Sequence, residues 1–413
     1  MPNIIRKQVV IIGGGPAGLA AAVELKKNGI SDLIVLEREK QPGGILRQCI
    51  HDGFGLTRFQ ETMSGPEYAQ RFIDEVNTLG IEIVTDTTVI DLTAEKLVTA
   101  TSSKGIIFYQ AEAIILAMGC RERTRGALSI PGSRPAGVFT AGVVQAYINL
   151  KNLMVGREVV ILGSGDIGMI MARRMTLEGA KVKAVFEILP YASGLPRNIE
   201  QCLNDYNIPL YLNHTITEIH GKARLTGVTV SEVDENRQVL AGSGKFYACD
   251  TLILSVGLIP ENELSKKAGV ELDPRTKGAI VDENYQTSVS GIFAAGNVLH
   301  VHDLVDFVSL EAENLAHGVL HYLKNSLPPC VIAITADGIS HTIPQRISGE
   351  RDIKLFFRVR QPQQNCMIEI QQDGKTIAHR KFQKALPAVM EQINLPAIKL
   401  TSKNPIKVVV KDA

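Results

Sequence analysis

The 413-residue chain contains no Trp, and aromatic residues make up only 5% of it. We therefore expect no aromatic surface for stacking sugars or the bases of single-stranded nucleic acid. No sign of charge dominates either, because Lys and Arg number 44, Asp and Glu number 43, and the net charge is +1. A nucleic-acid-binding protein would show a clear basic excess. The composition thus predicts no nucleic-acid partner.

Long apolar runs are also missing. No stretch reaches the roughly 18 uninterrupted apolar residues that a membrane-spanning helix requires. The apolar segment 9–23 is broken by Gly13, Gly14, Gly15 and Pro16. This interruption also argues against a signal peptide, which has a continuous apolar core. We therefore expect no membrane span.

The six cysteines are scattered, and the closest two along the chain are Cys330 and Cys366. Such spacing fits neither a disulfide framework nor a zinc motif. We expect a cytoplasmic protein with mostly buried thiols and no metal site.

What the sequence does contain is a repeat. Residues 9–18 read VVIIGGGPAG, and residues 159–168 read VVILGSGDIG. In both copies a β-branched run precedes Gly-x-Gly-x-x-Gly, a helical stretch follows, and a second apolar strand ends in an acid, Glu37 or Glu187. In this context the helix N-terminus binds the pyrophosphate of a dinucleotide, and the acid accepts hydrogen bonds from the ribose. We therefore predict two dinucleotide sites.

The repeat also predicts individual elements. We expect helices over residues 19–27 and 169–177, and strands over 33–36 and 182–186. Further along, the apolar runs 113–119 and 251–257 form a second pair, whereas 291–296 has no counterpart. The first nucleotide domain (1–120 and 251–326) is thus predicted to be interrupted by the second (121–250).

The end of the chain follows a different pattern. After Pro328-Pro329, alternating β-branched segments appear at 354–359, 367–370 and 406–410, and Asp373-Gly374 is typical of a hairpin turn. Residues 328–413 hold 13 Lys and Arg against 7 Asp and Glu. We predict a C-terminal all-β domain over 327–413, which is either purely structural or, as we favour, a basic docking surface. The fold class is then α/β, with two nested Rossmann-like (three-layer ββα) domains plus this β domain.

The second acid bears on cofactor choice. A carboxylate at Glu187 favours a free ribose 2′-hydroxyl and repels a 2′-phosphate. No Arg or Lys occurs in residues 188–195, and Arg197 is the nearest. The sequence therefore favours NAD(H) over NADP(H).

These motifs resemble those of the two-dinucleotide-binding flavoproteins, which include thioredoxin reductase, glutathione reductase and the NADH oxidases. The resemblance covers about residues 5–326 and implies FAD in the first site and NAD(P)H in the second. It also implies that Ala117-Met118-Gly119 links the domains and that residues 291–297 form a second FAD fingerprint. Asn297 stands where the family usually has Asp, and we expect its carbonyl to accept the ribitol hydroxyl instead.

The disulfide reductases of this family carry paired cysteines beside the flavin. Here the segment 43–51 contains Cys49 alone, and the segment 138–142 contains no cysteine. A dithiol relay is therefore not expected. Electrons must leave the flavin for dioxygen, a small acceptor or another protein's cofactor.

Three stretches, residues 48–55, 65–69 and 296–306, resemble a narrower group. These are the NADH-oxidase-like flavoproteins that accompany FAD-dependent glycerol-3-phosphate dehydrogenases. The stretches are also similar to the α subunits of dye-linked amine, proline and cyanide-forming glycine dehydrogenases. The resemblance implies a partner, a separate FAD-dependent dehydrogenase subunit.

Residues near the flavin are further candidates. We predict Gln48, Cys49 and His51 as catalytic, with Cys49 either a bystander thiol or redox active. The group His300, His302 and Asp303 resembles a zinc site, but its place after Gly296-Asn297 favours positioning the helix from Leu304 onward. The predicted cofactor-binding residues are Gly13, Gly15, Pro16, Ala17, Gly18, Glu37, Arg38, Gly44, Arg47, Val89, Ala117, Met118, Gly119, Gly163, Gly165, Asp166, Ile167, Gly168, Glu187, Gly257, Gly296, Asn297, Val305 and Asp306.

The sequence thus predicts an FAD-dependent NAD(H):acceptor oxidoreductase. Hydride transfer between NADH and FAD requires positioning rather than a protein acid or base. The electrons pass to dioxygen or to a partner dehydrogenase's flavin, and the flow could also run toward NAD⁺. Two alternatives remain: an α-type subunit of a heteromeric amine or imino-acid dehydrogenase, and a flavoprotein that senses NADH.

Overall fold

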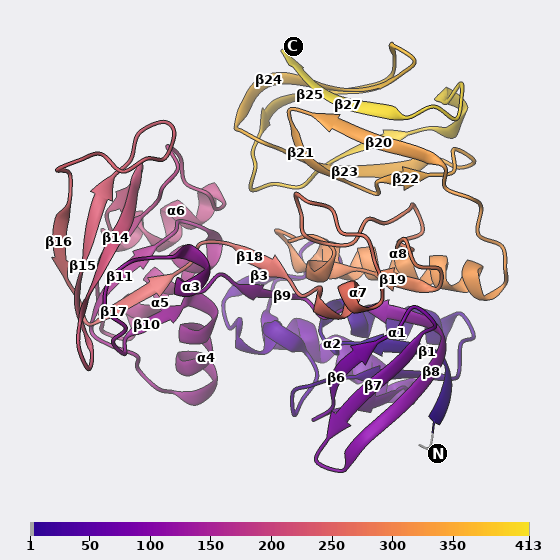
Figure 1. The fold of residues 1–413 in the computed structure, drawn as a ribbon, viewed down its shortest axis with the longest axis horizontal. Coiled ribbons are helices and arrows are strands. Elements are labelled where there is room, and N and C mark those ends of the chain that lie inside the picture. The colour runs from indigo at the N-terminus through magenta and orange to yellow at the C-terminus, as the bar shows by residue number, and fades with distance from the viewer. Residues whose placement is uncertain (1–3, 413) are drawn as a thin grey trace. The chain divides into compact units, whose positions relative to one another are not determined.

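The computed structural model describes residues 4–412, which form two compact units (Figure 1). The first unit contains the residues up to Cys120 and those from Pro260 onward, and the second unit runs from Arg121 to Ile259. The chain therefore leaves the first unit, builds the second and then returns to the first.

A seven-stranded sheet lies at the centre of the first unit. Its order is β5-β2-β1-β8-β7-β6, and β19 pairs with β8. The neighbours β5-β2-β1-β8-β19 run parallel, whereas β6, β7 and β8 are antiparallel. The buried run Val9–Ile11 in β1 is continuous and apolar, as in parallel strands covered on both faces. The strands are β1 Ile4–Ile12, β2 Leu33–Leu36, β5 Glu82–Val84, β6 Thr88–Leu92, β7 Leu97–Ser102, β8 Gly105–Leu116 and β19 Ile292–Ala294.

Helix α1 of this unit packs against α2 and α8. It begins at Pro16 rather than at the predicted Leu19, because proline suits the first helical turn, where the backbone N–H has no partner in any case. The predicted strand 33–36 is confirmed as β2. The remaining elements before the C-terminal strands are α1 Pro16–Lys27, η1 Gly44–Gln48, β3 Asp52–Phe54, β4 Met63–Ser64, α2 Gly65–Thr78, α7 Glu263–Lys267, η3 Gly296–Val298 and α8 Val305–Leu323.

The second unit repeats the plan with a five-stranded parallel sheet of order β10-β17-β11-β12-β13 and a three-stranded antiparallel sheet, β14-β15-β16. Its first nucleotide-type helix, α5, begins at Asp166, earlier than the predicted Met169. The predicted strand 182–186 is confirmed within β12. The elements are α3 Arg125–Leu128, β10 Val138–Thr140, α4 Ala141–Lys151, β11 Glu158–Leu162, α5 Asp166–Leu177, β12 Lys181–Phe186, α6 Pro196–Cys202, η2 Asn204–Tyr206, β13 Leu210–Tyr211, β14 His214–Gly221, β15 Leu225–Glu232, β16 Lys245–Ala248 and β17 Thr251–Leu254. Two short strands at the chain crossings, β9 Cys120–Glu122 and β18 Leu258–Pro260, pair with each other.

The boundary predicted after residue 250 lies too early. β17, Thr251–Leu254, lies between β10 and β11 and pairs in parallel with both. A strand in the middle of a sheet belongs to that sheet's core, so the second unit continues to Ile259.

Residues 332–412 form two further sheets within the first unit, of order β22-β20-β27-β24-β25 and β21-β23-β26. The predicted turn Asp373-Gly374 is confirmed as a two-residue hairpin loop, with positive φ at both positions. The predicted strands 354–359, 367–370 and 406–410 lie within β23, β24 and β27. The elements are β20 Ile332–Asp337, β21 Ile339–Ile343, β22 Arg346–Ile347, β23 Ile353–Val359, β24 Gln363–Gln372, β25 Lys375–Ala385, β26 Glu391–Leu395, η4 Ala397–Lys399 and β27 Ile406–Asp412.

Helix α8 is 19 residues long and rich in apolar side chains. It nevertheless buries two acids, Asp306 and Glu311. Over residues 4–412, no helix combines the length and the apolar character that crossing a membrane requires.

Candidate functional site

The first glycine turn brings three segments into contact. Gly13 has φ +110°, and a Cβ on it would lie 2.4 Å from the carbonyl oxygen of Ala117 at the end of β8. A Cβ on Gly18 would lie 1.9 Å from the carbonyl oxygen of Gly13. Any side chain at these positions would push α1 away from β1 and β8. The glycines therefore set the N-terminus of α1 directly beyond the strand ends.

That helix N-terminus offers its amides to an anion. Gly15 is the N-cap, and no side chain among the described residues caps the helix. Gly44, with φ +58°, follows close by, since a Cβ on it would lie 3.0 Å from Cα of Gly15. Backbone that no side chain covers, at a helix N-terminus, fits a pyrophosphate.

Glu37 follows β2 and is 5% exposed. Its carboxylate accepts hydrogen bonds from the N–H of Gly14 at 2.7 Å and of Glu39 at 2.8 Å. The next residue, Arg38, is largely exposed. Val89 lies two residues after Thr87, whose N–H donates to the carbonyl of Glu37 at 3.0 Å. Glu37 and Arg38 thus follow β2 directly, whereas Val89 belongs to β6.

The second copy has the same construction in the second unit. Gly163 has φ +101°, and a Cβ on it would lie 2.0 Å from the carbonyl oxygen of Ser255, just after β17. Glu187 is 4% exposed and accepts the N–H of Ser164 at 3.0 Å and of Leu189 at 3.1 Å. The hydroxyls of Ser164 and Ser193 also donate to it, at 2.6 and 2.9 Å. The two repeats therefore fix their acids through the same backbone positions.

Asp166, the first residue of α5, is hydrogen-bonded to the start of α6. Its Oδ1 accepts the N–H of Leu195 at 2.7 Å and the amide of Asn198 at 2.6 Å. The side chain thus holds the start of α6 against α5. Of the other predicted residues of this copy, Ile167 packs against the core and Gly257 accepts the N–H of Arg123 at 3.1 Å.

The segment predicted to line the flavin forms η1 and the turn after it. Gln48 and Cys49 are each 8% exposed, and the thiol of Cys49 donates to the carbonyl of Ile45 at 3.4 Å. The ring of His51 lies 5.0 Å from that of Phe54. None of the six cysteines forms a disulfide in the part of the chain that the structure describes.

Asp306 lies in the first turn of α8. It is 2% exposed, and its carboxylate accepts the backbone N–H groups of Gly55, Thr57 and Arg58 at 3.1, 3.1 and 2.7 Å. Asp306 thus positions the loop 55–58 against the start of α8, and its role in cofactor binding stays a prediction. Val305 is the first residue of that helix.

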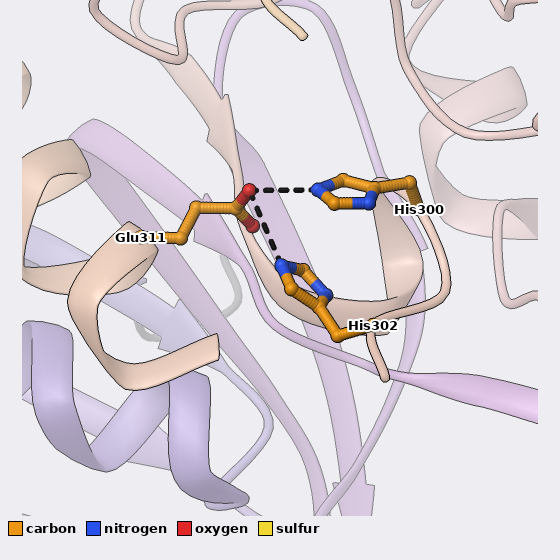
Figure 2. A group of neighbouring side chains, drawn as sticks. All are labelled: His300, His302 and Glu311. Atoms are coloured by element: carbon orange, nitrogen blue, oxygen red, sulfur yellow. Dashed lines mark hydrogen bonds and ion pairs between the residues drawn. The ribbon is translucent and has the colours of Figure 1, made fainter. Parts of the chain in front are cut away.

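The second predicted fingerprint leads into a buried polar cluster (Figure 2). Oε2 of Glu311 lies 2.8 Å from Nε2 of His300 and 3.4 Å from Nε2 of His302. Oε1 accepts the N–H of Gly296 at 2.7 Å. Asn297 belongs to the same cluster, because its Oδ1 accepts the N–H of His302 at 3.0 Å. Its carbonyl, which we expected to meet the ribitol, is thus engaged by His302.

Burial dominates the electrostatics of this cluster. Burial, and to a smaller extent the neighbouring His302, lowers the pKa of His300 to about 4. Burial, and to a smaller extent the nearby His300, lowers the pKa of His341 to about 3. Burial alone would raise the pKa of Glu311, but the two imidazoles outweigh it and hold that pKa well below its usual range. These shifts leave His300 and His341 neutral and Glu311 ionised at neutral pH.

Sequence reasoning grouped the wrong acid with the two histidines. Asp303 instead lies 3.3 Å from the guanidinium of Arg358 and accepts the N–H of Met390 at 3.2 Å. Glu311 takes its place from α8, the helix that begins at Val305, shortly after His302. That helix carries three acids, Asp306, Glu311 and Glu313, and their spacing alone does not tell which of them faces the histidines.

A family model for pyridine nucleotide-disulphide oxidoreductases matches residues 7–317. The chain belongs to this family. Its members use FAD and NAD(P)H. The two glycine turns, each with an open helix N-terminus and a buried acid, fit these two dinucleotides.

Several relatives are similar over most of the chain. Thioredoxin reductase of Rickettsia prowazekii is 28% identical over 313 residues, covering 71% of this chain and 90% of that protein. Hydrogen cyanide synthase subunit HcnB of Pseudomonas protegens is 26% identical over 319 residues (71% and 64%). An opine oxidase subunit of Agrobacterium tumefaciens is 24% identical over 312 residues (70% and 60%). The last two are subunits of heteromeric enzymes.

A solved structure agrees with the fold. The crystal structure of T. acidophilum thioredoxin reductase matches with a TM-score of 0.64 at 25% identity, covering 78% of this chain and 99% of that one. This likeness supports a mixed α/β fold with Rossmann-like sheets. The chain spans between 45% and 64% of the length of the first curated relatives that it matches.

Proposed function

We propose that this chain is an NAD(H):acceptor oxidoreductase in which electrons leave FAD without a dithiol relay. The observation that carries the proposal is the lack of a second cysteine in the segments where a relay would lie. The flavin-loop segment 43–51 contains only Cys49, and the segment 138–142, where some disulfide reductases carry their pair, contains no cysteine. A disulfide relay needs two thiols close enough to bond.

The chain's own residues supply binding and positioning. The amides at the N-terminus of α1 hold the FAD pyrophosphate, Glu37 the adenosine ribose, and the segment around Arg47, Gln48 and His51 the flavin. FAD, when bound, accepts a hydride from the nicotinamide. Asp306 acts indirectly, because its carboxylate fixes the loop 55–58 that follows this segment.

Glu187 favours NADH over NADPH as the electron donor. Four hydrogen bonds from Ser164, Leu189 and Ser193 fix its carboxylate at the end of β12. A carboxylate in this place accepts the 2′-hydroxyl of NADH and repels the 2′-phosphate of NADPH. No basic residue follows within 188–195 to offset that repulsion.

The acceptor is dioxygen or the flavin of a partner dehydrogenase subunit. The stretches 48–55, 65–69 and 296–306 resemble those of flavoproteins that accompany FAD-dependent glycerol-3-phosphate dehydrogenases. Two curated relatives carry names of heteromeric enzyme subunits. The basic C-terminal segment 328–413 is the surface that we assign to the partner.

An anaerobic titration of the purified flavoprotein tests the donor and the missing relay together. We predict that NADH bleaches the visible flavin band with about one equivalent per FAD, that NADPH acts far more slowly, and that Cys49→Ser behaves like the wild type. Air or an added dye should then restore the band. Failure of both nucleotides to bleach it would refute the donor assignment.

A required role for Cys49 would show itself differently. Cys49→Ser would then be reduced by NADH but would pass no electrons to any acceptor that the wild type uses. The matched control is Cys366→Ser, which replaces a buried thiol of the C-terminal strands.

The second candidate is an α-type subunit of an amine or imino-acid dehydrogenase. The subunit names of the HcnB and opine oxidase relatives favour it. Co-expression with FAD-dependent dehydrogenase subunits encoded beside this chain separates the two. Substrate-driven reduction of dye by the complex, in the absence of NADH, supports this second function.

A further inference from the structure

Three metal-ligating side chains meet outside the two glycine turns. The donor atoms of His300, His302 and Glu311 all lie within 4.8 Å of one another. Figure 2 shows the two rings from the loop after η3 pointing at the carboxylate from α8. Their side chains are only 2%, 4% and 6% exposed. This is a convergent, dehydrated set of two imidazoles and one carboxylate.

The set lacks a compensating cation. Across residues 4–412, the ion-pair partners of Glu311 are His300 and His302 alone, with no Lys or Arg among them. A buried carboxylate costs free energy unless a positive charge pairs with it. Metal ions bind histidine through an unprotonated ring nitrogen and glutamate through its carboxylate.

We propose that His300, His302 and Glu311 bind a divalent first-row metal ion, and that Zn²⁺ fits them best. Zinc binds nitrogen and oxygen ligands at about 2.0–2.2 Å in tetrahedral geometry, which places ligand atoms about 3.3–3.5 Å apart. Nε2 of His302 already lies 3.4 Å from Oε2 of Glu311. Nε2 of His300 lies 2.8 Å from the same oxygen, and it would have to move away by only about half an ångström.

Neighbouring groups hold two of the three ligands in the required orientation. Nδ1 of His302 lies 3.3 Å from Oδ1 of Asn297, so this ring can donate its other N–H to a carbonyl oxygen. Oε1 of Glu311 accepts the N–H of Gly296 at 2.7 Å. Metal-bound histidines and carboxylates usually carry such outer hydrogen bonds.

A fourth donor lies beside the three. His341, from β21 of the C-terminal sheets, has its ring centre 5.8 Å from that of His300. Its Nε2 is buried and has no hydrogen-bond partner among the described residues, and the same holds for Nδ1 of His300. His341 is not among the donors that lie within 4.8 Å of one another, so its ring would have to approach His300 before it could supply the fourth ligand. The ion would then join the loop at 296–302, helix α8 and strand β21 within the first unit.

The metal content of the full-length flavoprotein tests this proposal. The protein is purified without a polyhistidine tag from zinc-supplemented medium, and metal and FAD are quantified in the same sample. We expect about one zinc per chain in the wild type, a loss of at least tenfold in Glu311→Gln and His302→Gln, and weaker retention in His341→Gln. X-ray absorption at the zinc edge should show imidazole scattering and no sulfur ligand.

Matched variants on the same helix serve as controls. Glu313→Gln and His317→Gln change a carboxylate and an imidazole of α8 outside the cluster, and both should keep the zinc. If a cluster variant fails to fold, the wild type still decides, since removing zinc with a chelator should lower its melting temperature without releasing FAD. Three results overturn the proposal: wild-type protein that takes up no zinc when it is added, equal zinc in all variants, or sulfur ligands at the zinc edge.

Discussion

The acids at the ends of β2 and β12 are held by hydrogen bonds from their own chain. Glu37 accepts the N–H of Gly14, and Glu187 accepts that of Ser164, the same position in each repeat. The two sites differ in one respect, because Ser164 also donates its hydroxyl to Glu187. Charge-assisted hydrogen bonds of this kind are stronger than neutral ones and fix geometry. These hydrogen bonds therefore oppose any rotation of the Glu187 side chain that would make room for a larger substituent on the ribose.

Reversing this charge should change nucleotide preference. We predict that Glu187→Arg raises the ratio of kcat/KM for NADPH to that for NADH by at least about tenfold, which corresponds to about 1.4 kcal/mol. The guanidinium removes the repulsion and binds phosphate. Steady-state dye reduction with both nucleotides measures the ratio.

The matched control is Glu218→Arg, which places the same charge on a half-exposed position of β14 in the same unit. This variant should leave the ratio unchanged. An unchanged ratio in Glu187→Arg would remove Glu187 from the nucleotide site.

The sequence predicted some residues of the site better than others. Glu37 and Glu187 could be placed because each acid directly follows a strand after a glycine turn. Asp303 and Glu311 could not be told apart, because the choice depends on which side chain the packing of α8 turns toward the histidines. Linear spacing predicts neighbours within one element well and partners from different elements poorly.

At the scale of elements, the start of α8 organises a distant loop. Asp306 lies in the first helical turn and receives three amides from the loop 55–58. Arg58 of that loop also pairs with Glu313 on the same helix at 2.8 Å. The helix thus fixes the backbone that follows the predicted flavin-lining segment.

Removing this carboxylate should free the loop. We predict that Asp306→Ala exposes the amides at 55–58 to solvent, because one buried and two partly buried hydrogen bonds lose their acceptor. A buried donor left without a partner costs about 1–3 kcal/mol. Hydrogen exchange over residues 52–62 should therefore speed up by at least about tenfold.

Asp74→Asn, an exposed acid on α2, is the control for this measurement and should leave the loop protected. Asp306→Ala with wild-type exchange at 55–58 would mean that other contacts hold the loop.

The elements themselves were largely predictable. β-branched runs, glycine turns and helix stops follow a local pattern, so β2, β12 and the Asp373-Gly374 hairpin are confirmed. The helix starts were missed by three residues, since a proline and an acid inside the glycine motifs already belong to α1 and α5. The end of a motif and the start of a helix need not coincide.

At the scale of the whole molecule, the C-terminal strands are joined to the rest of the first unit. Glu283 accepts the N–H and hydroxyl of Ser348 at 2.9 and 2.8 Å and pairs with Arg351 at 3.0 Å. Ile343 is fully buried in the same core cluster as the nucleotide-type sheet. These contacts cross from the C-terminal sheets to the segment before β19.

Deleting these strands should therefore weaken the nucleotide-type part. We predict that a chain ending at Pro329 melts at least about 5 °C below the wild type and loses FAD more readily, because buried Glu283 and Asp303 lose their partners. Calorimetry and flavin release on heating measure both effects.

Arg351→Ala removes one of these contacts and should lower the melting temperature by less than the deletion does. A truncated chain with wild-type melting and FAD content would show that the C-terminal strands are an independent module.

The nested order of the units was predictable from motif spacing, but the crossing point was not. The apolar run after residue 250 resembles its counterpart at 113–119, and the sequence therefore assigned it to the resumed first unit. The pairing of β17 with β10 and β11 decides otherwise. Which sheet a buried strand joins is a matter of long-range pairing, which local composition does not encode.

The interrupted first unit also constrains synthesis. β8 pairs with β19, and α1 packs against α8, so both partners come from beyond the second unit. A ribosome that has made the first 120 residues has exposed an apolar sheet whose completing strand and covering helix are still unmade. The second unit, which is contiguous in the chain, can fold as soon as it emerges. The segment that is synthesised first therefore completes its folding last, and its apolar surface needs protection from aggregation until then.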